Sequence, residues 1–230
     1  MKKQSRSEAT REALMRAAEK LIATKGLENV SIREIVDAAG QKNESALQYH
    51  FKSLDGLVRA IHEVRDAQIN PMRMVQIEKL TSANGKPTLR DISKLMVEPA
   101  FLLARSKPDF RQYIKAFGHE IALTDRSASK TARRGDGATD REIRRLLRGA
   151  LPALNNAAFD LRLDSAVRFI ASSMYHQARQ PNAFKGDRAE LFFSSLIDAL
   201  VGMLGAPESA ETIQLSEAAS KPPARAGVEN

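Results

Sequence analysis

The sequence of 230 residues contains no cysteine, and only 5% of its residues are aromatic. Without cysteine, the chain cannot form a disulfide bond or a metal site with thiolate ligands. No apolar run approaches the roughly 18 residues of a membrane-spanning helix, and the basic N-terminus is not followed by the apolar segment of a signal peptide. These absences lead us to expect a cytoplasmic protein with no membrane partner.

Motifs of catalysis are also missing. The four histidines, His50, His62, His119 and His176, show no i,i+4 pairing with each other and no carboxylate in a metal-ligand spacing. There is no glycine-rich phosphate loop, nucleophile elbow or pair of catalytic carboxylates. We therefore predict that the chain is not an enzyme and uses no metal or cofactor.

The composition favours helices. Apolar residues make up 43% of the chain, but the alternation of Val, Ile and Thr that is typical of strands is missing almost everywhere. A chain of this length suits a small helical module together with a second, larger core. We predict an all-α protein with two lobes.

The charge favours an anionic partner. Lys and Arg outnumber Asp and Glu by 36 to 28, and the resulting pI is about 9.8, which is typical of proteins that bind nucleic acid or a membrane surface. Residues 1–25 contain seven basic and three acidic side chains. Such an arm could follow DNA phosphates or enter a minor groove, or it could simply be a solvated terminus.

The segment Ser31–Phe51 has the pattern of two short helices joined by a sharp turn. Ser31 and Glu34 form the S-x-x-E pattern of a capping box, Gly40 can adopt the left-handed conformation of a tight turn, and Asn43 suits the start of a second helix. The apolar face of the first helix consists of Ile32, Ile35, Val36 and Ala39. This pattern predicts a helix-turn-helix, although tight glycine turns also occur in helical proteins that bind no DNA.

The second helix, residues 44–51, is predicted to read DNA. Burial of Ala46 or Leu47 and of Phe51 leaves polar side chains on the outside, of types that contact bases and phosphates. The predicted DNA-binding residues are Ser31, Arg33, Gln41, Lys42, Asn43, Ser45, Gln48, Tyr49, His50 and Lys52.

The run from Thr10 to Ile61 resembles the TetR family of one-component repressors. Its shared features are an inner face on the first helix, a Lys-Gly stop, a Ser at the next helix start, the Ala-Gly and Tyr-His-Phe motifs, and then a Lys and an acidic residue before a leucine. In this sequence they are Ala17, Ala18, Leu21, Lys25, Gly26, Ser31, Ala39, Gly40, Tyr49, His50, Phe51 and Leu57. The segment after Gly40 is one residue longer than the usual spacing of the family.

The resemblance implies a ligand-responsive transcriptional regulator. We expect a repressor that binds a near-palindromic double-stranded DNA operator as a homodimer and is released by an unidentified small molecule. The alternative is a helical DNA-binding protein without an inducer that binds mainly by charge. The fold implied is a three-helix DNA-binding domain followed by a helical ligand-binding and dimerisation domain.

The expected domain limits follow from loops and prolines. We predict an arm and helix-turn-helix domain at 1–52, a connecting helix at 53–70, a helical domain at 71–205 and a disordered tail at 206–230. Pro71 is expected to break or kink the connecting helix, with a short helix after it. The polar segment 124–137 is predicted to be a spacer loop.

The last two strong helices, 161–180 and 188–204, have a surplus of apolar and small side chains. By the resemblance they join their twins in a four-helix dimer interface, although they could instead only complete the monomer core. The predicted interface residues are Val167, Ile170, Met174, Leu191, Phe192, Leu196 and Leu200. Ser172, Ser173 and Gly202 are small enough to allow close approach of a neighbouring helix.

The resemblance also implies a mostly apolar pocket in the second lobe. Its candidate ligand-binding residues, each of which could instead be an ordinary core or surface residue, are Met96, Phe101, Tyr113, Phe117, His119, Met174, Tyr175 and His176.

Overall fold

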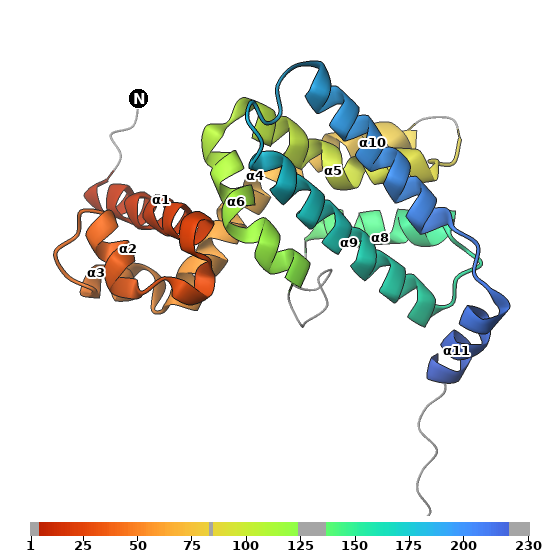
Figure 1. The fold of residues 1–230 in the computed structure, drawn as a ribbon, viewed down its shortest axis with the longest axis horizontal. Helices are drawn as coiled ribbons and strands as arrows, with labels where there is room; N and C mark the ends of the chain where they lie inside the picture. Colours follow the sequence, from red (N-terminus) through yellow and green to blue (C-terminus); the bar gives the residue numbers. More distant parts are fainter. Residues whose placement is uncertain (1–4, 83–84, 124–136, 221–230) are drawn as a thin grey trace, which may run out of the picture.

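The computed structural model describes residues 5–82, 85–123 and 137–220, and within these ranges it contains helices and no strands (Figure 1). The predicted all-α fold is therefore confirmed. The helices are α1 (Arg6–Lys25), the 3-10 helix η1 (Leu27–Asn29), α2 (Ile32–Ala38), α3 (Ser45–Phe51), α4 (Leu54–Ser82), α5 (Leu89–Ser106), α6 (Pro108–Leu123), α8 (Ala138–Ala150), α9 (Asn156–Ala178), α10 (Gly186–Gly205) and α11 (Ala210–Ser220).

Local hydrogen bonds fix the helix starts. The predicted capping box at Ser31 and Glu34 is present, with both reciprocal hydrogen bonds formed. The Lys25 ammonium and the Ser31 backbone N–H lower the pKa of Glu34 to about 2. An equivalent capping box at Ser5 and Glu8 starts α1.

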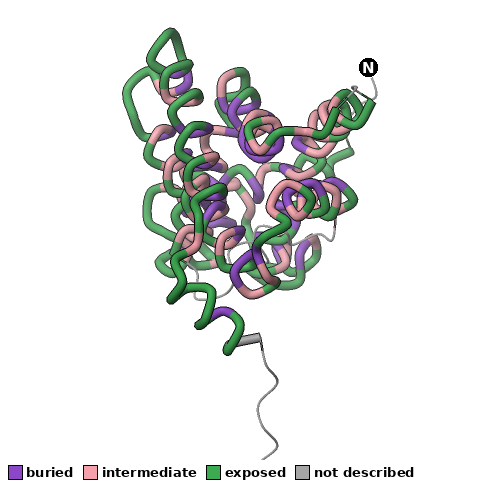
Figure 2. Tube along the Cα trace, turned by 90° about the vertical axis from the view of Figure 1, so that its right-hand side faces the viewer, coloured by how far each residue is buried: buried purple, intermediate pink, exposed green. Residues whose placement is uncertain are grey.

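The helices pack into two hydrophobic cores. The first joins α1, α2 and α3 to the beginning of α4, and it also contains Ala116 and Phe117 of α6. The second is built by α5, α6, α8, α9 and α10. In Figure 1 the three N-terminal helices lie together at one end of the molecule, and α4 leads from them into the larger lobe. Figure 2 shows the buried residues on the inner sides of the helices.

The structure of α4 differs from the break or kink that was predicted at Pro71. The helix runs without interruption from Leu54 to Ser82 with Pro71 inside it, so the predicted end at residue 70 and the separate short helix after it are wrong. Pro71 removes one backbone donor, which leaves the carbonyl of Ala67 without its intrahelical partner. Because Pro71 and Ala67 are both exposed, water can bind that carbonyl. The predicted domain limits at residues 52 and 70 stay a prediction.

The structure of the C-terminal tail differs from the disorder that was predicted for it. Residues 210–220 form helix α11, so the expected disorder is wrong for this part of 206–230. Asn155 Nδ2 donates to Ser216 Oγ at 2.6 Å, which holds α11 against the start of α9. The predicted spacer loop falls almost entirely on 124–136, and these residues, like 1–4, lie outside the described ranges.

No single helix among the described residues is long and apolar enough to cross a bilayer. Only α10 taken together with residues 210–218 of α11 has the length and hydropathy of a span, and these two helices are bent by 70° relative to each other.

Candidate nucleic-acid interface and internal cavity

The turn between α2 and α3 has the geometry that the sequence predicts. Gly40 has a φ of +68°, a conformation that glycine adopts without strain. The Gln41 N–H donates to the Val36 carbonyl at 3.0 Å, and the Ser45 N–H donates to Asn43 Oδ1 at 2.9 Å. These bonds end α2 and start α3 within a few residues, so α3 is held at a fixed angle to α2.

Helix α3 has one buried and one polar face. Leu47 and Phe51 are buried in the N-terminal core, whereas Gln48 is exposed and Tyr49 is 73% exposed. A large aromatic side chain with this much exposure on a short helix has no role in packing the subunit. The polar face of α3 is therefore available to a partner.

The ten predicted DNA-binding residues lie on this end of the molecule. Eight are exposed, and Gln41 and His50 are half-buried. The ring of His50 lies edge-on to Tyr49, with 5.0 Å between ring centroids. Lys52, just after α3, has a φ of +69°, and Arg33 is exposed on α2 near Asp37, at 4.0 Å. The roles of the ten residues in DNA binding stay predictions.

A concave surface brings the start of α1 next to α3. It is lined by Arg6, Thr10, Gly40, Gln41, Lys42, Asn43, Ser45, Ala46 and Tyr49. Arg6 and Thr10 are additions to the predicted set. The basic composition of the N-terminal arm was the signal for Arg6, but only the packing of α1 beside α3 shows that Arg6 shares a surface with the turn.

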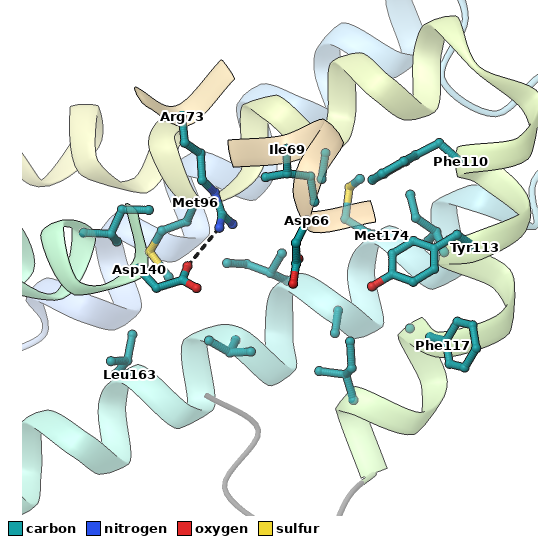
Figure 3. Close-up of a pocket in the computed structure, with 18 of the residues that line it drawn as sticks. Asp66, Ile69, Arg73, Met96, Phe110, Tyr113, Phe117, Asp140, Leu163 and Met174 are labelled. Carbon is teal, nitrogen blue, oxygen red and sulfur yellow. Dashed lines mark hydrogen bonds and ion pairs between the residues drawn. The ribbon is translucent and has the colours of Figure 1, made fainter. Parts of the chain in front are cut away.

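A second hollow lies inside the larger lobe. It is a cavity of about 200 Å³ between α4, α5, α6, α8 and α9 (Figure 3). Most of its walls are apolar, and the polar lining residues are Asp66, Arg73, Tyr113, Asp140 and Arg144. A mainly apolar cavity with a few convergent polar groups is typical of small-molecule sites.

The polar groups that line the cavity differ in their hydrogen-bond partners. Arg73 Nη1 donates to Asp140 Oδ1 at 2.9 Å, and the Tyr113 hydroxyl lies 2.9 Å from His62 Nδ1. Among the described residues, no donor lies within hydrogen-bond distance of the Asp66 carboxylate. Burial, together with the nearby Asp140, raises the pKa of Asp66 to about 6, although Arg73 opposes the shift.

The predicted ligand-binding residues divide evenly. Four of them line the cavity, namely Met96, Tyr113, Phe117 and Met174. The other four do not. Phe101 is buried against Phe184 and Phe193 in the second core. The exposed His119 lies with its ring tilted against that of Tyr175, with 5.5 Å between centroids, and the exposed His176 lies beside Gln180.

The charged lining residues were missed by sequence reasoning. Asp66, Arg73, Asp140 and Arg144 fall outside the apolar stripes of their helices, where a charged residue is normally solvated. Nothing in their local sequence distinguishes them from surface charges.

The predicted dimer residues need a correction. Met174, Leu196 and Leu200 are buried within a single subunit, so they belong to its core and cannot supply an accessible interface. Val167 and Ile170 are half-buried and line the cavity. Leu191, in contrast, is 68% exposed, and Phe192 is half-buried.

A buried ionic cluster joins the two lobes. Arg65 of α4 donates to Glu19 of α1 at 2.8 and 2.9 Å and to Asp109 of α6 at 2.7 Å. Glu19 and Arg65 are only 3% and 5% exposed. Burial raises the pKa of Glu19, and the Arg65 guanidinium opposes that shift. The cluster thus connects α1, α4 and α6 at one place beside the cavity.

We expect Asp66→Asn to stabilise the unliganded protein at alkaline pH. Since the pKa of Asp66 is about 6 in the folded chain against 3.8 in the unfolded one, the folded state binds this proton more tightly. The ionised carboxylate therefore costs stability, with no cost below about pH 4 and the full cost above about pH 6. Allowing for partial exposure, the variant should gain about 1–2 kcal/mol.

Urea unfolding at pH 8 and pH 4, at one subunit concentration, measures this difference. The gain should be present at pH 8 and absent at pH 4. The exposed Glu63→Gln, on the same helix, serves as the acid-to-amide control and should change little at either pH. A loss of stability in Asp66→Asn at pH 8 would show that the carboxylate has a stabilising partner.

The solved structures that are similar to this chain include the following three. A putative TetR-family transcriptional regulator from Mesorhizobium loti is 16% identical, with 86% of this chain and 98% of that chain covered and a TM-score of 0.47. CprB, a TetR family protein from S. coelicolor, is 21% identical, with 93% and 98% covered and a TM-score of 0.46. RolR in complex with resorcinol is 17% identical, with 94% and 95% covered and a TM-score of 0.46.

No curated protein matches the chain. The family model that matches is that of the bacterial regulatory proteins, tetR family, and it covers residues 14–61. These residues include the inner face of α1, the capped α2, the glycine turn and the polar-faced α3. Over these residues the chain is therefore similar to the bacterial regulatory proteins of the tetR family.

Proposed function

We propose that the protein is a ligand-responsive repressor that acts in the cytoplasm, binds a near-palindromic operator as a homodimer, and leaves it when a small molecule occupies the cavity. The observation that carries the proposal is the position of α6. Phe117 of α6 both lines the cavity and packs in the core that holds α3. A ligand that changes the shape of the cavity would therefore displace α6, which packs against the N-terminal core that holds α3.

Coupling requires that the ligand distinguish two states of the protein. A ligand that binds both conformations equally shifts nothing, however tightly it binds. Tyr113 supports such a distinction, because it lines the cavity and its hydroxyl meets His62, which in turn contacts Phe117. A ligand that displaces Tyr113 would also disturb the contact between α4 and α6.

Dimerisation through α9 and α10 is supported by what these helices expose. Their outer surfaces carry apolar and small side chains, namely Leu161, Ser165, Phe169, Ser172, Leu191, Ser194, Ser195, Ala199 and Gly202. Small residues let two helices approach closely, and apolar ones gain from removal of water. A two-fold dimer would present two α3 helices to half-sites about one DNA turn, or a multiple of it, apart.

Gly202→Gln is expected to weaken this dimer without harming the subunit. A Cβ at Gly202 would meet nothing within 4 Å among the described residues, so the side chain fits the isolated subunit. Removal of a helical glycine should stabilise that subunit by about 0.5–1 kcal/mol. If α10 packs against its twin, the same side chain blocks close approach, and we expect the dimer dissociation constant to rise at least about tenfold.

Sedimentation over a range of concentrations measures the dimer. Gly149→Gln in α8 is the matched control, because its Cβ also meets nothing within 4 Å and its helix is outside the proposed interface. Both variants should gain stability, and only Gly202→Gln should lose the dimer. Equal sedimentation of the two would place the interface elsewhere.

A competition assay tests the function itself. The full-length protein is titrated into labelled DNA from upstream of its own coding region, with random DNA as competitor. A specific repressor should prefer its operator by roughly 10³ or more, whereas a protein that binds by charge alone gives a ratio near unity. A ratio near unity at every upstream fragment would favour the charge-only alternative.

A further inference from the structure

We propose that the cavity binds an organic cation, with an ammonium group against the Asp66 carboxylate and a body of about one aromatic ring among the apolar walls. The inference rests on the proposed function, since it names the chemical class of the effector. It does not depend on which operator is bound.

The charges that line the cavity leave one carboxylate in excess. Arg73 forms its ion pair with Asp140 at 2.9 Å, and Arg144 forms an ion pair with Asp160 outside the lining. Asp66 is the remaining charged lining residue. Taken together, Asp66, Arg73 and Asp140 carry two negative charges and one positive charge, so the described lining favours a cation over an anion.

Asp66 is placed to receive such a cation. In Figure 3 its carboxylate and the Tyr113 hydroxyl both point into the cavity. No donor among the described residues satisfies the carboxylate, and a charge removed from water without a partner is costly. The raised pKa of Asp66 reflects this cost. A bound ammonium would supply both the missing charge and the missing donors.

The other requirements of the site limit the size and polarity of the ligand. A cavity of about 150 Å³ in another protein holds one benzene ring, and the cavity here is about 200 Å³, which leaves room for a short side arm. Phe110, Ile114 and Leu163 are among the apolar wall residues, so the body of the ligand should be apolar. An aromatic ring with a short aminoalkyl arm meets these conditions.

Three probes of nearly equal size separate the possible ligand charges. We suggest calorimetric titration of the full-length protein at pH 7.5 with 2-phenylethylamine, 2-phenylethanol and phenylacetate. The amine should bind at least about tenfold more tightly than the alcohol, and phenylacetate should be the weakest. This order follows from the excess carboxylate alone, because the ring is common to all three probes.

Substitution of Asp66 assigns the preference to one residue. In Asp66→Asn, the affinity for the amine should fall to that for the alcohol, while the affinity for the alcohol changes by less than about threefold. Retained alcohol binding shows that the cavity is intact. The exposed Glu63→Gln, one turn away on α4 and outside the lining, should keep the full preference for the amine.

Three results would overturn the inference. They are binding of the alcohol or of phenylacetate as tightly as the amine, an amine preference that survives in Asp66→Asn, and no heat of binding from the amine up to about 10 mM. The proposed function is judged separately by the operator competition assay. Specific operator binding with release by a neutral or anionic compound would remove only the present inference, whereas a lack of sequence preference would remove the repressor function whatever the amine does.

Discussion

Arg65→Met should lower the free energy of unfolding by about 3–5 kcal/mol. Arg65 is the single cation between Glu19 and Asp109 in the cluster that ties α1, α4 and α6. Its loss leaves the carboxylate of Glu19, which is 3% exposed, without a counter-charge. Urea unfolding at a fixed subunit concentration measures the loss, because the proposed dimer would make stability depend on concentration.

Two further variants show that the uncompensated charge is the cause. Asp109→Asn, whose side chain is 51% exposed, should cost no more than about 1 kcal/mol. The double variant Glu19→Leu with Arg65→Met should recover most of the stability, since it removes both buried charges and keeps similar volumes. A loss below about 1 kcal/mol in Arg65→Met would mean that water reaches Glu19 after the substitution.

Gln48→Ala and Tyr49→Ala are expected to have the largest effect on operator binding. Both side chains lie on the exposed face of α3 and make no contribution to the N-terminal core. A side chain that reads a base edge contributes about 1–3 kcal/mol of discrimination, so the double variant should bind its operator about 10²–10³-fold more weakly. Random DNA should lose much less, because phosphate contacts remain.

Lys52→Ala provides the contrast. An exposed lysine at a phosphate should weaken all sequences alike and reduce the salt slope of binding by about one. Gel-shift titrations at several salt concentrations measure both effects, and sedimentation shows that the variants stay folded and dimeric. Unchanged operator affinity in both Gln48→Ala and Tyr49→Ala would exclude α3 as the reading helix.

Features of the DNA-binding lobe could be predicted because they depend on neighbours in the chain. A capping box needs only residues three apart, as at Ser31 and Glu34, and the turn needs only a glycine that tolerates a positive φ. The spacing of Leu47 and Phe51 likewise determines which face of α3 is buried. The family resemblance adds the order of the elements over the same residues.

Periodicity was less informative for the C-terminal helices. It groups residues by helix face, but it does not say which apolar face meets the core and which one meets a second subunit. Leu196 and Leu200 therefore looked like interface residues and are core residues, while Leu191 is exposed. Pro71 shows the same limit of periodicity. The loss of helix stability that a proline causes depends on whether water can bind the carbonyl that the proline leaves without a backbone donor.

What the amino-acid sequence determined by itself is the helical class, the capped start of α2 and the polar face of α3, since these follow from interactions within a few residues. Only the tertiary structure decided where the cavity lies and what lines it. Asp66, Arg73 and Asp140 come from two helices separated by more than one intervening helix in the chain. Their charges interact because packing brings those helices together in a region with little water, and no local pattern encodes that distance.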